Sequence, residues 1–406
     1  MSHTKQAEQS KKNRWLPQEV FVDNETTEKK ATWLELFFDL AYVAVVAQLT
    51  YFLVENQTLT DFVKFVFLFL VVFWSWLNPT IFKNIYHKED AIYTALTQIQ
   101  MLFVLVMGVH TKDAFNGGAI GFTVGYLGTR VILIYLYLRY YKQHPEKAPK
   151  TKNIVTGYTV AACMWLASIF VPNPFTFLIW VLAFILEILT PYTRGKGNKI
   201  VMLNMHHLPE RMGLFTLLVI GESMIVLALV NNAADLSFTL NGAITGILAF
   251  ILMVSTWRLY FKYTERHIAG KRLKSLSMFL YMHALFFMGI MMVAAATKVL
   301  LSDPAKTAGV EMMHLVGGLV ACIVGFDGIK IATNQKIGPQ IRHGIVPLII
   351  MVMGVVTWSI KPLTSLIVLT TVFVIYVIIE HRTRYGIQSW RAFCINCVAP
   401  RVKSKR

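Results

Sequence analysis

Long apolar runs alternate with short polar or basic segments along almost the whole chain. An α-helix needs about 17–25 apolar residues to cross ~30 Å of hydrocarbon. Twelve runs meet this requirement and predict twelve membrane-spanning helices. Their expected ranges are 34–54, 62–82, 92–110, 118–138, 154–171, 175–191, 213–230, 238–261, 277–297, 312–332, 344–360 and 363–379.

The boundary between the fifth and sixth runs allows two arrangements, because only Val171-Pro172-Asn173-Pro174 separates them. The two runs fit a re-entrant pair, whose irregular backbone would be buried in protein. They also fit two complete spans joined by a tight turn, which proline favours. The turn is the simpler interpretation.

Composition supports a membrane protein and excludes several other classes. Of the 406 residues, 55% are apolar and 15% are charged, and the mean hydropathy is +0.54. This balance excludes an ordinary soluble enzyme and is the opposite of a disordered chain. The 24 Gly and 13 Pro lack a three-residue period, and four Cys are too few for a disulfide scaffold. The sequence therefore predicts an all-α, polytopic membrane helix bundle.

The formal charge of +17 would suit a nucleic-acid-binding protein, so the positions of the basic residues decide what it means. Tails and connections on one side of the predicted membrane hold 32 Lys and Arg residues, against 4 on the other side. Positively charged segments stay in the cytoplasm. We therefore expect both termini to be cytoplasmic, and we expect no nucleic-acid partner.

Two basic tails flank the predicted spans. Residues 1–32 are polar and show no signal peptide, and we interpret them as a cytoplasmic tail. Residues 381–406 combine Trp390 and Phe393 with several Lys and Arg residues. That mixture is typical of an amphipathic segment lying on anionic lipid head groups. The expected partners are the lipid bilayer and those head groups.

A weak internal similarity appears when the sequence is compared with itself at an offset of 183 residues. The offset aligns Asp39 with Glu222 and Gln100 with His283. It equals six predicted spans, an even number, so the two halves would have the same orientation. We predict two parallel six-helix halves, residues 33–200 and 201–380; chance similarity between apolar helices is the alternative.

Charged residues inside the predicted spans are the candidates for function, since each costs about 2.5–3.5 kcal/mol near the bilayer centre unless it faces protein or water. Glu35 and Asp39 lie four residues apart and share a helix face. Two neighbouring carboxylates can bind a cation or pass on a proton. Glu222 is expected near the middle of the seventh span, where it must be paired, hydrated or protonated. A structural anchoring role is the alternative for all three.

Arg130, Gln100 and His283 complete the set of candidate pathway residues. Arg130 is central in the fourth span and needs a carboxylate, for which Asp39 and Glu222 are the expected partners. Gln100 lies on a polar stripe with Tyr93 and Thr97 at helical spacing. His283 could titrate near neutral pH, although a lone histidine in a bundle is more often simply hydrogen-bonded.

Motifs for known enzyme chemistry are absent from the sequence. It has no phosphate-binding loop, dinucleotide-binding glycine motif, zinc-protease motif or serine-hydrolase motif. Cys394 and Cys397 form a single CxxC pair without a second pair to complete four metal ligands. The cofactor, if there is one, is left open, and the protein is more consistent with a non-enzyme.

Two sequence blocks resemble the bacterial low-temperature-requirement A (LtrA) family. The first is Thr32-Trp33-Leu34-Glu35-Leu36-Phe37-Phe38-Asp39-Leu40, and the second joins Glu210-Arg211-Met212-Gly213-Leu214-Phe215-Thr216 to Val219-Ile220-Gly221-Glu222-Ser223. The resemblance implies a multi-pass protein of a bacterial plasma membrane. It supplies no catalytic residue, and it marks Glu35, Asp39, Glu210 and Glu222 as the acidic positions of the family.

Three functions are consistent with these features. The first is a transporter or channel for a cation or a proton-coupled solute, with Asp39 and Glu222 at equivalent inner positions and Arg130 as their counter-charge. The second is a non-transporting membrane scaffold or lipid-interacting protein whose buried charges are structural. The third, an integral-membrane enzyme, lacks the clustered Asp, His or Arg motifs that such enzymes usually carry on cytoplasmic loops.

Overall fold

The computed structural model describes ten stretches of the chain. They are residues 31–56, 58–85, 90–143, 148–192, 207–228, 240–264, 273–302, 309–333, 340–357 and 361–398. The tail up to residue 30 and the side chains from residue 383 onward lie outside the described residues. The predictions for the two basic tails and for the CxxC pair therefore fall outside them as well.

Every regular element in the described stretches is a helix. The α-helices are α2 (Trp33–Glu55), α3 (Leu59–Ile85), α4 (Ala91–Thr111), α5 (Ala119–Gln143), α6 (Ala148–Ser168), α7 (Phe175–Leu189), α8 (His207–Ala228), α9 (Leu240–Thr264), α10 (Leu273–Ser302), α11 (Val310–Ala332), α12 (Gln340–Thr357) and α13 (Pro362–Val398), and η2 (Thr190–Tyr192) is a short 3-10 turn. Each of the twelve predicted spans coincides with one α-helix. The all-α prediction is confirmed.

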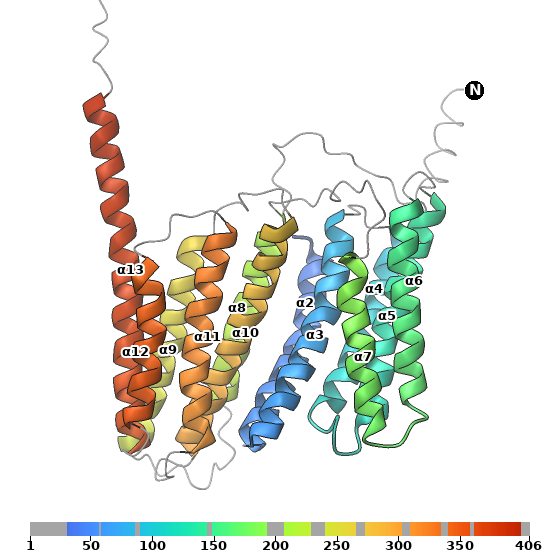
Figure 1. The fold of residues 1–406 in the computed structure, drawn as a ribbon, viewed down its shortest axis with the longest axis horizontal. Helices are drawn as coiled ribbons and strands as arrows, with labels where there is room; N and C mark the ends of the chain where they lie inside the picture. Colours follow the sequence, from blue (N-terminus) through green and yellow to red (C-terminus); the bar gives the residue numbers. More distant parts are fainter. Residues whose placement is uncertain are drawn as a thin grey trace, which may run out of the picture.

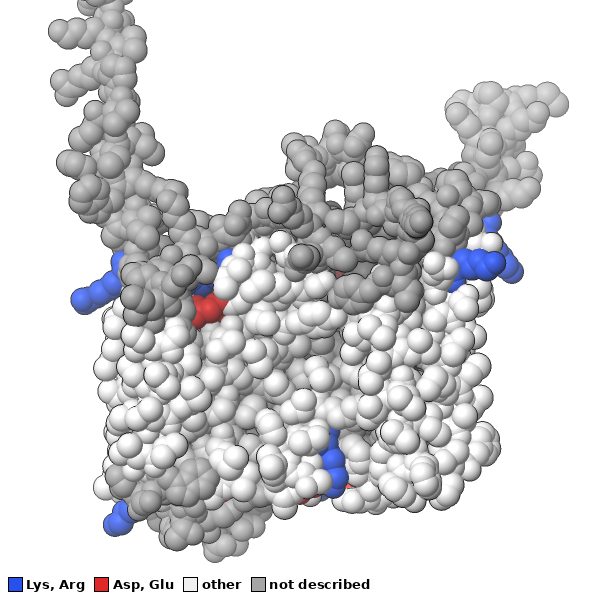
Figure 2. Space-filling model, in the orientation of Figure 1, with Lys and Arg blue, Asp and Glu red and all other residues white. Residues whose placement is uncertain are grey.

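The surface of the bundle is apolar over a broad band. Nine helices of the described residues are long and apolar enough to cross a membrane, and α7 and residues 344–357 of α12 are shorter apolar helices. On the face shown in Figure 2, Lys and Arg side chains lie at the upper and lower edges of an uncharged band. An exposed apolar surface of this extent is stable in lipid and not in water. The protein is therefore a polytopic helical membrane protein.

The helices stand upright and side by side in a bundle more than one helix deep (Figure 1). α2 and α3 occupy the centre of the view, α4 to α7 lie on one side of them, and α8 to α13 lie on the other. α6 and α7 pack against one another. α6 is not among the nine helices in the described part of the chain that are apolar enough to cross a membrane, and α7 is shorter, so the choice between two spans and a re-entrant pair stays a prediction. Most of the contact between the first six and the last six helices is made by α2 and α3 against α8 and α10. We call this contact the central interface.

The same neighbours recur in each set of six helices. α2 packs on α3 and α4, and α5 packs on α3, α4 and α6, while the matching pairs α8 with α9 and α10, and α11 with α9, α10 and α12, also form. The last two helices of each set pack on one another as well. This order supports the predicted two-half organisation of residues 33–200 and 201–380, which remains a prediction.

Glycines bring the central hairpin of each half into close contact. A Cβ atom on Gly125 of α5 would lie 2.4 Å from the backbone nitrogen of Met107 on α4. A Cβ atom on Gly325 of α11 would lie 2.8 Å from the backbone nitrogen of Phe286 on α10. Only glycine permits backbones to approach so closely. The α4–α5 and α10–α11 hairpins therefore pack in the same way.

These glycines belong to a sequence repeat with an offset of 200 residues. Residues 117–128 read GGAIGFTVGYLG and residues 317–328 read GGLVACIVGFDG, with four glycines and one valine identical. The offset of 183 is therefore wrong for this pair of helices. Connections of different length separate the matching helices, so no single offset describes the whole chain.

Candidate functional site

The start of α2 positions two carboxylates on one buried face. Thr32 caps the helix: its hydroxyl accepts from the Glu35 backbone N–H (3.3 Å), and its own N–H donates to Glu35 Oε2 (2.8 Å). This capping box fixes the Glu35 side chain. Asp39 follows one helical turn later on the same face. Their exposed fractions are 3% and 0%.

The start of α8 faces these carboxylates with two basic side chains, also one turn apart. His207 Nε2 lies 3.3 Å from Glu35 Oε2. Arg211 reaches both carboxylates, with Nη1 3.3 Å from Glu35 Oε1 and Nη2 2.5 Å from Asp39 Oδ1. The register of the two helices matches Glu35 to His207 and Asp39 to Arg211, so α2 and α8 run side by side in the same direction.

Trp76 on α3 closes the third side of this group. Its indole Nε1–H donates to Asp39 Oδ1 at 2.7 Å, and its ring stacks on Phe215 of α8 with centroids 4.1 Å apart. We call Glu35, Asp39, Trp76, His207 and Arg211 the inner ion cluster. Because α2 and α3 belong to the first six helices and α8 to the last six, the cluster joins the two sets across the central interface.

A small pocket lies against the inner ion cluster, lined by side chains from α2, α3, α4 and α8. Its volume of about 10 Å³ corresponds to about one water molecule. The polar lining comprises Glu35, Thr80, Lys83, Tyr93, Thr97, Gln100 and Arg211. The polar stripe expected on the third span thus faces a pocket. The Thr97 hydroxyl is sealed from solvent and makes no hydrogen bond among the described residues.

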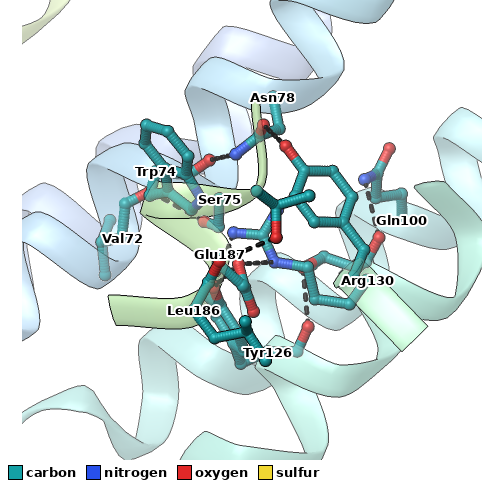
Figure 3. Close-up of polar contacts among 12 residues, drawn as sticks. Val72, Trp74, Ser75, Asn78, Gln100, Tyr126, Arg130, Leu186 and Glu187 are labelled. Atoms are coloured by element: carbon teal, nitrogen blue, oxygen red, sulfur yellow. Dashed lines mark hydrogen bonds and ion pairs between the residues drawn. The ribbon is translucent and has the colours of Figure 1, made fainter. Parts of the chain in front are cut away.

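Arg130 lies in a second buried network, within the first six helices (Figure 3). Its Nε is 3.1 Å from Glu187 Oε2 of α7, and its Nη2 donates to the Tyr126 hydroxyl at 2.6 Å. Tyr126 in turn donates to Glu187 Oε2 at 2.7 Å. The prediction that Arg130 pairs with Asp39 or Glu222 is wrong, because the buried Glu187 already compensates its charge.

A model of the family described as "Bacterial low temperature requirement A protein (LtrA)" matches residues 30–379, which include both networks. The chain belongs to this family. It is also 22% identical over 378 residues to a protein of Rhizobium meliloti (strain 1021) named "Uncharacterized protein RA0937". That alignment covers 88% of this chain and 92% of the relative.

Glu222 of this LtrA protein lies far from Asp39, contrary to the predicted equivalent positions. α8 begins at His207, so Glu222 falls in its last third rather than in its middle. The register of α2 and α8 puts Glu222 about eleven residues beyond Arg211, a separation of ~17 Å along the helix axis. Tyr51 of α2 lies close enough to Glu222 for an electrostatic interaction between the two side chains.

Gln100 and His283 occupy different surroundings. Gln100 lines the pocket and donates from Nε2 to the Thr129 carbonyl at 3.1 Å. His283 is buried on α10, with Nε2 2.8 Å from the Tyr260 hydroxyl and Nδ1 2.7 Å from the Phe279 carbonyl. These contacts agree with the second interpretation of His283, a histidine that is simply hydrogen-bonded inside the bundle.

Several buried cations were missed because they fall at the ends of apolar runs and were assigned to connections. Lys83, Arg211, Lys298 and Lys330 lie within helices, each with about 1% of its surface exposed. Removing three from the predicted cytoplasmic side and one from the other leaves the charge asymmetry in place. The spacing of His207 and Arg211, which equals that of Glu35 and Asp39, is the signal that could have found the inner ion cluster.

Lys330 repeats the arrangement of Arg130 in the second half. The offset of 200 aligns the two cations, and Lys330 pairs with Glu380 of α13 as Arg130 pairs with Glu187 of α7. Glu187, near the inner end of the sixth predicted span, is fully buried. In the described residues no group of three His, Cys, Asp or Glu side chains could hold a metal ion.

Proposed function

We propose that this LtrA-family protein is a transporter that moves a small cation, or a solute coupled to protons, along the central interface between its two six-helix halves. The inner ion cluster carries this proposal. Its ion pairs join α2 to α8 and stand beside a polar pocket. An ionic contact between two halves, next to a polar cavity, is the position of a gate in an alternating-access transporter.

The rest of the central interface supports the same proposal. Next to the cluster, Trp76 and Phe73 of α3 contact Phe215 and Phe287 of the second half, with ring centroids 4.1 and 6.0 Å apart. This aromatic layer separates the cluster from the far end, where Glu222 lies. We interpret the inner ion cluster as a closed gate and the aromatic layer as an apolar barrier. Glu222 then lies on the far side of that barrier, in a pathway that is closed at the end holding the cluster.

The proposed gate opens when the two halves move apart at the end that holds the cluster. Arg211 must then leave Asp39 and Glu35, and these carboxylates become available to a cation from that side. Because basic segments flank the same ends of the helices, we propose that this side is cytoplasmic, that both termini lie there, and that the membrane is the bacterial plasma membrane.

Flux measurements in proteoliposomes test the proposal. Vesicles containing the purified protein would be assayed for Na⁺ and K⁺ uptake and, with an internal pH-sensitive dye, for proton movement. We expect flux above protein-free vesicles, a loss of at least tenfold in Asp39→Arg and in Arg211→Asp, and partial recovery in the doubly charge-swapped protein.

An ion pair away from the interface provides the matched control. Asp61 and Lys64 at the start of α3 are paired at 3.0 Å, and we expect Asp61→Lys combined with Lys64→Asp to leave the flux unchanged. If the wild-type protein carries none of these ions, the transport proposal is wrong. The non-transporting scaffold, favoured by the buried ion pair of Arg130 and Glu187, would then be the better explanation.

A further inference from the structure

The end of the central interface opposite the inner ion cluster holds a second set of buried charges. Glu222 on α8 has 5% of its surface exposed, so it faces the protein interior. Among the described residues it makes no hydrogen bond or ion pair, and its carboxylate oxygens are not among the sealed polar atoms. A carboxylate with this burial requires a positive charge, a proton or water.

Lys298 on α10 reaches the same part of α8. Its Nζ donates to the carbonyl oxygen of Val226 at 3.0 Å and lies 4.8 Å from the centre of the Tyr51 ring. Val226 follows Glu222 by four residues, one helical turn or about 6 Å along the same helix face. A carbonyl and an aromatic face therefore contact the ammonium group, on the side of Glu222 that lies toward the C-terminal end of α8.

The two groups belong to helices that α2 also contacts, and Tyr51 of α2 lies near both. Among the described residues, Tyr51 is the titratable side chain whose charge interacts with Glu222, and Lys298 lies beside Tyr51 and the next turn of α8. A lysine side chain is long and flexible, so rotation about its four-carbon stem can move Nζ through a distance of one helical turn.

We infer that Glu222 is the binding site for the coupling cation, a proton or an alkali-metal ion, and that Lys298 is the internal cation that replaces it. In the state described here the ammonium group rests on Val226 and Tyr51, and the carboxylate is open to a cation. After the cation leaves, Lys298 pairs with Glu222. This pairing neutralises the buried carboxylate and lets the protein without a bound cation return to the conformation that binds the next one. The inference rests on the proposed transport function and adds the class of ion and its competitor.

The inference distinguishes exchange from net transport. Lys298→Met keeps the length of the side chain and removes its charge, so the loaded protein can still cross between states while the empty one keeps an uncompensated carboxylate. We expect exchange of ²²Na⁺ against internal Na⁺, or of protons across a pH gradient, within about twofold of wild type. We expect net uptake to fall at least tenfold. Lys298→Arg, which keeps the charge, serves as the matched control and should retain net uptake.

Two assay conditions identify the ion. In pH-clamped vesicles only an alkali-metal ion gives cation-dependent exchange, and in sodium-free vesicles with a clamped potential only proton coupling gives a pH change. Glu222→Gln should lose exchange in whichever condition is active. In detergent, a shift of the melting temperature with Na⁺ or with pH should be present in wild type and absent in Glu222→Gln.

Failure of the inference and failure of the transport proposal give different results. If wild-type vesicles transport a cation and Lys298→Met still accumulates it at the wild-type rate, the role of Lys298 is refuted. If Glu222→Gln keeps both exchange and the melting-temperature shift, Glu222 is not the binding site. If wild-type vesicles carry no ion in either condition, the proposed function itself is wrong.

Discussion

The inner ion cluster and the Arg130 network are alike in chemistry and different in position. Each buries a guanidinium against a carboxylate, with exposed fractions of 3% or less for all the ionised side chains. The Arg130 network joins α5 and α7 of one half, whereas the inner ion cluster joins α2 and α8 across the central interface. The pocket adjoins the cluster.

The comparison teaches that burial of a charge does not by itself indicate function. A buried ion pair within one rigid half stabilises that half, provided both partners stay in place. An ion pair between two halves can be broken by a movement that leaves each half intact. The position of a charge relative to the central interface therefore distinguishes a structural pair from a candidate gate.

The largest effect is expected from the Arg130 network. Arg130→Met leaves Glu187 buried without a counter-charge, which costs about 3–5 kcal/mol of unfolding free energy. Denaturant unfolding in detergent, followed by tryptophan fluorescence, would measure the loss. Arg130→Met combined with Glu187→Met should recover most of it, because both charges are then absent. A stable single variant that lacks transport would contradict the comparison and place Arg130 in the pathway.

The glycine contacts sharpen the comparison by testing whether each half is a rigid body. Gly325→Ala puts a methyl group 2.8 Å from the Phe286 backbone nitrogen, and the α10–α11 hairpin must separate to admit it. We expect a loss of about 1–3 kcal/mol in the same unfolding assay. Gly246→Ala, which meets no atom within 4 Å, is the matched control and should have no such cost. Equal effects at both positions would argue that the hairpin is loosely packed.

The lengths of the apolar runs were sufficient to predict the fold class and all twelve α-helices. Each run contains enough apolar residues to define a helix regardless of what packs on it. The exact ends of the helices were harder to predict. α8 begins at His207, six residues before the predicted run, because polar residues lower the local hydropathy there. Those six residues contain both basic members of the inner ion cluster, His207 and Arg211.

The candidate site was only partly accessible from sequence for the same reason. Glu35 and Asp39 were identified because a carboxylate in an apolar run is conspicuous. Their partners were not, because pairing depends on which helices are neighbours and in what register, and neither follows from hydropathy. Arg130 was assigned to Asp39 wrongly because the helix of Arg130 places its side chain against Glu187 of α7. Asp39 and Glu222 were matched wrongly because the register of α2 and α8 places Glu222 far from Asp39.

The smallest effect is expected from an ion pair at the protein surface. Lys112 Nζ lies 2.7 Å from Glu55 Oε2, with exposed fractions of 37% and 46% for the two side chains. The hydrogen bond to Glu55 raises the pKa of Lys112, so the pair stabilises the fold below the ordinary pKa of 10.5 and ceases to do so as pH rises through the raised value. Lys112→Met should cost under about 1 kcal/mol at neutral pH, by the same unfolding assay. The substitution removes a cation from a pair as Arg130→Met does, so the difference between the two losses measures what burial adds. Equal losses would mean that solvent screening does not separate surface pairs from buried ones in this protein.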